Sequence, residues 1–393
     1  MSEPAKKKQR SGASPTTVTG NGGGAHEPRE KINVGILGAT GMVGQRLIQL
    51  LANHPYFTVT HLGASSRSSG KPYENAANWK QPTPVPSHLA SLIIQPCESK
   101  HFRDVKIVFS GLDSDVAGPI EIEFLNANIA VFSNAKNHRM CADVPLIVPV
   151  VNTSHYDIIP FQRTQRNVER GLIVANANCS TTGLVVALKA LQDAFGDLDK
   201  VMVTTMQAIS GAGYPGISSI DVIDNIVPYI SGEEDKLETE ASKILGCTNS
   251  HNTAFVDAPL VISASCNRVP VIDGHTESVF VKFGDVSPDK SKRPVKPTID
   301  QIKSALREYK CEAQELGVPS APIHVIQVLE EADRPQPRLD RDVGNGMTVS
   351  VGRVRECTVF DVKFTLLSHN TILGAAGSAI MNAEVAVEKG LIL

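Results

Sequence analysis

The 393-residue sequence contains no apolar run as long as the roughly 18 residues that a membrane-spanning helix requires. Its N-terminal stretch also lacks the apolar segment of a secretory signal. The seven cysteines are scattered and form no C-x-x-C pair, which argues against a disulfide framework and against a metal site. The net charge is only −3, which gives no support for a nucleic-acid partner. We therefore expect a soluble cytoplasmic protein that has no metal site and binds neither nucleic acid nor membrane.

Composition and length point to a globular protein of more than one domain. Hydrophobic residues make up 41% of the chain and charged residues 20%, and 393 residues exceed one ordinary core. Residues 1–30 are rich in Gly, Ser, Thr and Pro, so we expect a disordered tail there. Its KKKQR run is interpreted as a solvated charge run, with a weak nuclear address as the alternative.

Strand and helix patterns alternate in the first part of the ordered chain. Apolar strands are predicted at 32–37, 57–64, 105–110 and 129–134, and helical patterns follow at 43–51 and 115–128. This alternation predicts an α/β fold with a doubly wound parallel sheet.

The pattern changes after Cys179. A helix at 180–195 precedes a strand at 200–210 that ends in a glycine-rich turn, and residues 258–284 read as strands joined through the Asp273–Gly274 turn signal. Later segments give a helix at 298–310, two long alternating strands at 348–356 and 357–368, and a final helix at 371–390. These patterns predict a second, α+β domain with a mixed or antiparallel sheet.

The turn after the first strand has the composition of a nucleotide site. Gly38, Gly41 and Gly44 follow the strand and open the helix, as a pyrophosphate site requires, although a tight turn without ligand is the alternative. An NAD site usually has an acidic residue at the end of the second strand. Here Ser65–Ser68 supply hydroxyls and the Arg67 guanidinium, which favours NADP over NAD unless this is only a solvated loop.

Cys179, within NANCSTTG, is the candidate reactive thiol. It begins a predicted helix, where the partial positive charge favours the thiolate, although a cysteine at such a position can be purely structural. Partners for chemistry stand at predicted strand ends in the second domain: Gln207, Arg268 and His275.

At this point the sequence resembles a known family. The motifs GATGMVGQ, SSRS, SNAKNHRM, NANCSTTG, QAISGAG, GEEDK, NRVPVIDGHTESV and HNTILGAAGSA occur in the order found in aspartate-β-semialdehyde dehydrogenases, in the branch shared by fungi, archaea and some bacteria. The resemblance runs from Lys31 to the end of the chain. It implies a Rossmann-like NADP-binding domain at 31–178, completed by the C-terminal helix 369–393, and a catalytic and oligomerisation domain at 179–368.

The resemblance also implies the role of each site residue. Cys179 is the expected nucleophile, His275 the acid/base and Gln207 a residue that positions the acyl group. Arg268 is expected to hold the substrate carboxylate and Glu233 its ammonium group, with Glu234 and Glu240 left open as alternatives. The expected phosphate-binding residues are Lys236 and Arg139, with Asn134 nearby. The expected cofactor-binding residues are Gly38, Thr40, Gly41, Met42, Val43, Ser65, Ser66, Arg67, Ser68, Ser210, Gly211 and Asn370.

The implied reaction is the NADPH-dependent reductive dephosphorylation of L-aspartyl 4-phosphate to L-aspartate 4-semialdehyde and phosphate. It would pass through a cysteine thioester and serve threonine and methionine biosynthesis, in a homodimer or a dimer of dimers. Three alternatives remain open: an N-acetylglutamyl-phosphate reductase, a malonyl-CoA reductase, or a non-catalytic NADP-binding protein.

Overall fold

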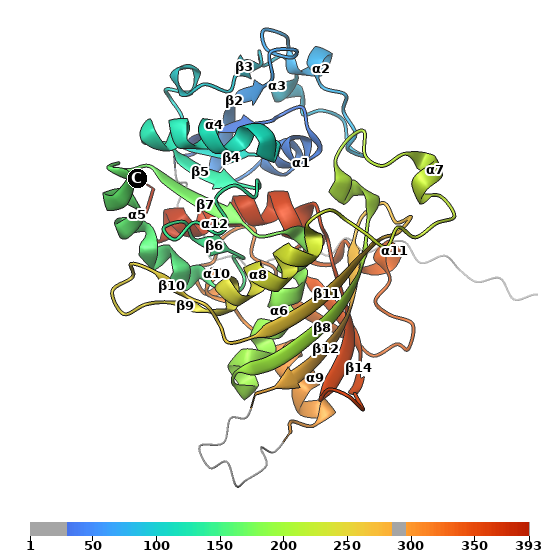
Figure 1. Ribbon diagram of the computed structural model, residues 1–393. Helices are drawn as coiled ribbons and strands as arrows, with labels where there is room; N and C mark the ends of the chain where they lie inside the picture. Colours follow the sequence, from blue (N-terminus) through green and yellow to red (C-terminus); the bar gives the residue numbers. More distant parts are fainter. Residues whose placement is uncertain (1–29, 285–295, 393) are drawn as a thin grey trace, which may run out of the picture. The chain divides into compact units, whose positions relative to one another are not determined.

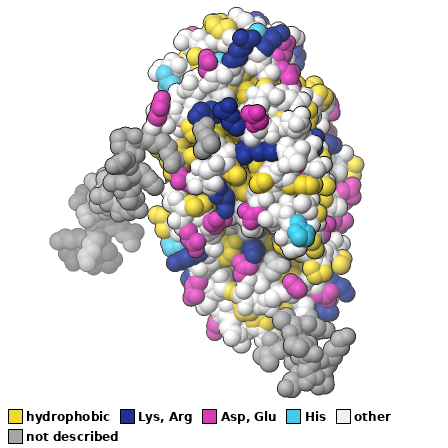
Figure 2. Space-filling model, turned by 90° about the vertical axis from the view of Figure 1, so that its left-hand side faces the viewer, with side chains coloured by type: hydrophobic (Ala, Val, Ile, Leu, Met, Phe, Trp, Pro, Cys, Tyr) yellow, Lys and Arg dark blue, Asp and Glu magenta, His cyan; other side chains and the backbone are white. Residues whose placement is uncertain are grey.

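The computed structural model describes residues 30–284 and 296–392 and contains two large β-sheets (Figure 1). The expected tail, except for Glu30, lies outside the described residues. Within the described part of the chain, no helix is both long and apolar enough to cross a membrane. On the face drawn in Figure 2, apolar, basic and acidic side chains are interspersed, in keeping with the small net charge.

The first sheet has seven strands in the order β3-β2-β1-β4-β5-β7-β6, and every pairing in it is parallel. Its strands are β1 (Ile32–Leu37), β2 (Phe57–Ala64), β3 (Gln95–Pro96), β4 (Ile107–Ser110), β5 (Ala130–Ser133), β6 (Leu146–Ile147) and β7 (Leu172–Asn176). The central strands are buried on both faces, which explains their continuous apolar sequences. The doubly wound parallel sheet predicted from the sequence is confirmed.

Helices from both ends of the chain cover this sheet. They are α1 (Met42–Leu51), α4 (Ser114–Asn126), α5 (Ile159–Arg166) and α12 (Gly377–Glu388). Helix α12, red in Figure 1, packs against β4, β5 and β7 and against α1. The division of the chain into domains at 178/179 and 368/369 stays a prediction.

The second sheet is mixed, with six strands in the order β11-β8-β12-β15-β14-β13. These strands are β8 (Leu198–Gln207), β11 (Val261–Arg268), β12 (His275–Phe283), β13 (Ile326–Leu329), β14 (Val349–Glu356) and β15 (Val362–Ser368). Helices α6 (Cys179–Phe195), α8 (Glu233–Leu245) and α9 (Ile299–Glu308) pack on one face. On the opposite face Met202 and Val261 are 40% and 63% exposed.

The Asp273–Gly274 turn lies in the connection that joins β11 to β12, as expected, but the two strands do not pair with each other as a β-hairpin. Strand β8 lies between β11 and β12, parallel to the first and antiparallel to the second. The reason is the connection itself, which bonds to the end of β8: Val269 N donates to Gln207 O, and Ile209 N donates to Val271 O. The end of β8 thus occupies the place that a hairpin partner would take.

Short elements connect the larger ones. The short strands and α-helices are β9 (Cys247–Thr248), β10 (Phe255–Val256), α2 (Tyr73–Ala76), α3 (Ser87–Ala90), α7 (Ser219–Val222), α10 (Glu312–Glu315) and α11 (Pro337–Asp340). The 3-10 helices are η1 (Ser99–His101), η2 (Thr153–Ile158), η3 (Ile209–Ala212) and η4 (Val343–Gly346), and η5 (Ile372–Ala376) is a π-helical turn that runs directly into α12. The turn η5 contacts α6.

Candidate active site

A cavity of about 330 Å³ collects most of the residues that the sequence singled out. The predicted residues that line it are Met42, Val43, Asn134, Arg139, Cys179, Gln207, Ser210, Gly211, Glu233, Lys236, Arg268 and Asn370. They come from the glycine turn and α1, from the segment after β5, and from the second sheet and its helices. The structure therefore brings most of the predicted catalytic and substrate residues, and part of the predicted cofactor residues, to one cavity.

Cys179 is the first residue of α6, as predicted. Asn178 caps this helix, because its side-chain oxygen accepts hydrogen bonds from Ser180 N at 2.9 Å and Thr181 N at 3.2 Å. The Asn178 amide group also donates to Glu233 at 2.8 Å. The cap fixes the position of the Cys179 backbone in the wall of the cavity.

His275, buried behind Cys179 at the start of β12, is its neighbour in space. Its Nε2 atom lies 3.2 Å from Cys179 Sγ, and its Nδ1 atom accepts a hydrogen bond from Ala208 N at 3.0 Å. Because Nδ1 is an acceptor, the neutral ring carries its proton on Nε2, facing the sulfur. Burial, with Arg268 nearby, lowers the pKa of His275 to about 3. At neutral pH His275 is therefore a neutral ring that points an N–H at the thiol.

The thiol does not have the lowered pKa that its helix-start position led us to expect. Removal from solvent, together with the Glu233 carboxylate, raises the pKa of Cys179 to about 12. Arg268, Arg139 and Lys236 act in the opposite direction without reversing the shift. Desolvation outweighs the helix terminus and the cations, so the pair is a thiol and a neutral imidazole rather than a thiolate and an imidazolium.

Three predicted site residues stand side by side on adjacent strands. Arg268 pairs with Gln207 across β11 and β8. His275 immediately precedes Thr276 on β12, and Thr276 pairs with Met206, the residue before Gln207 on β8. The Arg268 guanidinium donates to Ala208 O at 2.7 Å. Arg268 as a whole is only 5% exposed. The register of the sheet thus sets the spacing of these side chains.

Helix α8 places three acidic residues differently, which bears on the alternatives that the sequence left open. Glu233 lines the cavity and accepts from Lys236 Nζ at 2.5 Å. Glu234 instead accepts from Cys266 N at 3.0 Å, and Glu240 from Asn178 N at 2.7 Å. Burial raises the pKa of Glu233, but Lys236 and the amide donors outweigh it, so its pKa is lowered overall. Of the three, Glu233 is the carboxylate that lines the cavity.

Arg139 crosses from the segment after β5 to helix α8. Its two terminal nitrogens donate to Glu240 Oε1 and to Asn134 O, both at 2.9 Å. Its Nε atom is buried without a partner among the described residues. Asn134 also accepts from Asn176 Nδ2 at 3.0 Å. Arg139 and Asn134 are adjacent in the cavity, as predicted.

The glycine turn has the close backbone approach of a phosphate-binding turn. A Cβ atom on Gly44 would lie 2.2 Å from Gly38 O, and Gly38 itself has φ +72°, so both positions favour glycine. Helix α1 begins at Met42 after Gly41, which has no capping side chain, so its first amides remain available to an anion.

The other predicted cofactor residues fall in two places. Ser65–Ser68 form a turn at the end of β2, with Arg67 exposed, and together with Thr40 and Gly41 they lie outside the cavity lining. Asn370 Nδ2 donates to Ser210 Oγ at 2.8 Å, which joins two predicted cofactor residues from distant parts of the sequence.

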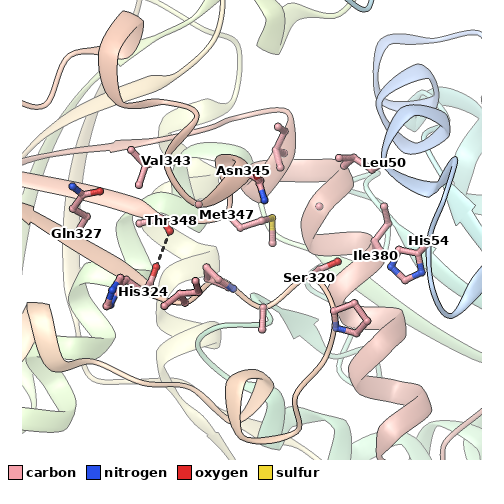
Figure 3. Close-up of a pocket in the computed structure, with 17 residues that line it drawn as sticks. Leu50, His54, Ser320, His324, Gln327, Val343, Asn345, Met347, Thr348 and Ile380 are labelled. Atoms are coloured by element: carbon pink, nitrogen blue, oxygen red, sulfur yellow. Dashed lines mark hydrogen bonds between the residues drawn. The ribbon is translucent and has the colours of Figure 1, made fainter. Parts of the chain in front are cut away.

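A larger cavity of about 460 Å³ lies elsewhere and is shown in Figure 3. Its lining includes Leu50, Met347, Ile380 and Ile372, so η5 borders it as well as the first cavity. Three of its polar side chains are hydrogen-bonded: Thr348 Oγ1 donates to His324 O at 2.7 Å, and Ser320 and His54 bond to Glu384. The cavity at Cys179, and not this one, contains the predicted site residues, so it is the candidate active site.

Sequence reasoning missed four residues around the site: Asn178, Lys136, Lys243 and Gly374. Asn178 is the helix cap and Lys136 lines the cavity. A Cβ atom on Gly374 would lie 2.8 Å from Cys179 Cβ. The cap had a sequence signal, since Asn precedes the helix, whereas the contact of Gly374 is visible only in three dimensions.

Comparisons with known proteins agree with this geometry. The family models "Semialdehyde dehydrogenase, NAD binding domain" and "Semialdehyde dehydrogenase, dimerisation domain" match residues 33–159 and 188–373. Aspartate-semialdehyde dehydrogenase of Cryptococcus neoformans is 56% identical over 370 residues, which cover 93% of this chain and 99% of the relative. The enzyme of Saccharomyces cerevisiae is 51% identical, and the match covers 91% of this chain and 98% of the relative. The enzyme of Archaeoglobus fulgidus is 46% identical, and the match covers 92% of this chain and 100% of the relative.

A solved structure is also similar. The crystal structure of aspartate semialdehyde dehydrogenase with NADP from Candida albicans has a TM-score of 0.84 and 50% sequence identity, and covers 92% of this chain and 100% of that chain. The two family models and the relatives, which match over nearly their whole length, indicate the same family. The Cys179–His275 pair is consistent with it. The chain belongs to the aspartate-semialdehyde dehydrogenase family.

Proposed function

We propose that the protein catalyses the reversible, NADPH-dependent reductive dephosphorylation of L-aspartyl 4-phosphate to L-aspartate 4-semialdehyde and phosphate. The observation that carries this proposal is the 3.2 Å contact between Cys179 Sγ and His275 Nε2 beside a cavity lined by Arg139, Lys236 and Arg268. A thiol, a proton donor and three cations are the groups that an acyl phosphate with a second carboxylate requires.

The nucleotide-binding residues support NADP as the cofactor. The turn at Gly38–Gly44 leaves the amides at the start of α1 free for a pyrophosphate, and Arg67 with its neighbouring serines suits a 2′-phosphate. The Candida albicans relative was solved with NADP. When bound, the reduced nicotinamide supplies a hydride to the acyl carbon.

Each substrate group has a matching side chain in the cavity. Arg268 offers a planar fork to the α-carboxylate, and the Glu233 carboxylate faces the ammonium group. Lys236 and Arg139 receive the phosphate, and Gln207 positions the acyl group. Attack by Cys179 gives a thioester and releases phosphate, which leaves with the thiol proton and so balances this step.

The reduction consumes one hydride and one proton. The hydride goes to the acyl carbon, and the C–S bond of the resulting thiohemiacetal then breaks to give the aldehyde. His275 is the acid/base at the departing sulfur, because its Nε2 atom faces that sulfur, and the proton that restores the thiol comes from solvent by way of the ring.

Related activities are the alternatives. An N-acetylglutamyl-phosphate reductase or a malonyl-CoA reductase would use the same cysteine–histidine pair, and a non-catalytic NADP-binding protein would use neither residue. Glu233 beside Lys236 favours a substrate that carries both an amine and a phosphate. Assays with the three substrates separate the enzymes, and the absence of turnover with all of them would leave the binding protein.

The deciding experiment is NADP reduction with aspartate semialdehyde in the presence and absence of phosphate. We expect turnover that requires phosphate and disappears in Cys179→Ala. Phosphate-independent oxidation would contradict the proposed reaction.

We also propose a place and an assembly for this enzyme. Activity in threonine and methionine biosynthesis follows from the product, and the seven free cysteines fit a cytoplasmic location. The domain assignment at 31–178, 179–368 and 369–393 is retained as a proposal. The family model's description as a dimerisation domain and the exposed Met202 and Val261 support a homo-oligomer built through the second sheet.

A further inference from the structure

Helix α8 carries four charged residues on one face, namely Glu233, Lys236, Glu240 and Lys243. Their spacings of three and four residues align them along the helix. Glu240 and Lys243 are 2% and 3% exposed, so each needs partners inside the protein. Glu233 and Lys236 line the active-site cavity. Glu240 and Lys243 lie about one and two helical turns after Lys236.

Glu240 uses its two oxygens for two different parts of the site. Oε1 accepts from Arg139 Nη1 at 2.9 Å, and Oε2 accepts from Asn178 N at 2.7 Å. Arg139 is the proposed phosphate ligand, and Asn178 caps the helix that begins with Cys179. One buried carboxylate therefore joins the phosphate site to the backbone that carries the nucleophile.

The Lys243 side chain holds the backbone of the segment that carries Arg139. Its Nζ atom donates to Arg139 O at 2.8 Å and to Cys141 O and Val144 O at 2.9 Å each. The main chain of Arg139 is thus held by one residue of α8 and its guanidinium by another. With both ends held, the charge of Arg139 has a defined position relative to Cys179.

We propose that Glu240 is a positioning residue that couples phosphate binding at Arg139 to the geometry of Cys179. This inference rests on the proposed function, because it takes Arg139 as the phosphate ligand. Glu240 does not line the cavity, so it acts through its two partners rather than on the substrate.

Only a carboxylate of this length performs the task. An amide at position 240 has one acceptor and an NH₂ group, which would face either the guanidinium or the Asn178 amide, donor to donor. An aspartate keeps the charge but is one methylene shorter, so it cannot span both partners. E240Q therefore removes the charge, and E240D removes the reach.

The first test measures phosphate protection of Cys179 against iodoacetamide, which needs neither turnover nor cofactor. In the wild-type protein, inorganic phosphate should slow the alkylation. In E240Q and E240D the phosphate concentration that gives half-protection should rise about ten- to a hundredfold, the loss expected for one charge-assisted bond. E238Q is the matched control, because Glu238 lies on the same helix and accepts from Ala264 N at 2.9 Å, away from the site.

The second test compares steady-state constants in the oxidative direction. E240Q and E240D should raise the KM for phosphate and lower kcat while leaving the KM for NADP unchanged, and E238Q should match the wild type. A variant that is merely unstable would lose active enzyme without a selective change in one KM. Should E240Q fold poorly, E240D provides the same comparison.

Two results would overturn the inference. The first is an E240Q variant whose half-protecting phosphate concentration and KM for phosphate equal those of the wild type. The second is a defective E240Q beside an E240D that behaves like the wild type, because the effect would then depend on charge alone. Failure of the proposed function is distinct: it would appear as a wild-type enzyme without phosphate-dependent turnover, whatever the variants do.

Discussion

At the scale of single residues, the Cys179–His275 pair determines how the reactivity of the Cys179 thiol depends on pH. The raised pKa of the thiol and the lowered pKa of the imidazole, about 12 and about 3, leave both groups neutral between these values. Alkylation of Cys179 in the unliganded protein should therefore accelerate about tenfold per pH unit from pH 6 to 9, because the thiolate fraction grows with pH. Peptide mapping of the labelled protein, with Cys179→Ala as the blank, measures this rate. A plateau below pH 8 would instead indicate a thiolate–imidazolium pair.

Arg67 tests the cofactor preference. If its guanidinium meets the 2′-phosphate, Arg67→Ala should raise the KM for NADP about tenfold and leave the weak use of NAD nearly unchanged, because NAD lacks that phosphate. Initial rates with each cofactor supply the comparison, and the NAD series is the internal control. An equal rise for both cofactors would place Arg67 outside the 2′-phosphate site.

The sequence could predict some of these residues but not others. Cys179, Gln207, Arg268 and His275 each stand at the end of a recognisable strand or helix, and such ends meet at a site. Among the acidic residues of α8 the sequence favoured Glu233 but left Glu234 and Glu240 open, and helical periodicity gives Glu233 and Glu240 the same face. Only the packing shows that one lines the cavity and the other is enclosed between Arg139 and Asn178.

At the scale of elements, the π-helical turn η5 sets the place of the nucleophile. Gly374→Ala should lower kcat strongly and destabilise the fold by about 1–3 kcal/mol, because the new methyl group would collide with Cys179 Cβ at 2.8 Å. Gly118→Ala in α4 is the control, since the nearest atoms to its methyl group belong to the Asn137 side chain, with the closest at 3.1 Å. Kinetics and thermal melting of both variants measure the effect. Full activity in Gly374→Ala would show that the turn yields easily.

Elements were predictable where the pattern was local. The limits of β1 and β2 follow from their apolar residues and coincide with the prediction, and α6 begins at Cys179, one residue before the predicted start. The neighbours of β11 and β12 could not be predicted from local sequence, because β8, which comes earlier in the chain, lies between them and pairs with both. A turn signal specifies that the chain reverses, and it does not specify which strand becomes the neighbour.

At the scale of the whole molecule, the open face of the second sheet predicts how subunits associate. We expect a mass of two or four chains of 42.1 kDa. A Met202→Glu/Val261→Glu double variant should shift towards smaller species, because both residues are exposed on that face. Val116→Glu, at an exposed residue of α4, is the control. Light scattering after gel filtration gives the masses. A wild-type mass of one chain would contradict the assignment.

The contact between Gly374 and Cys179 also orders events during synthesis. Cys179 and the strands of the parallel sheet precede η5 and α12 in the chain, so their contacts with these last elements can form only after nearly the whole chain has been synthesised. A nascent chain that ends before Gly374 lacks the residue that packs against Cys179.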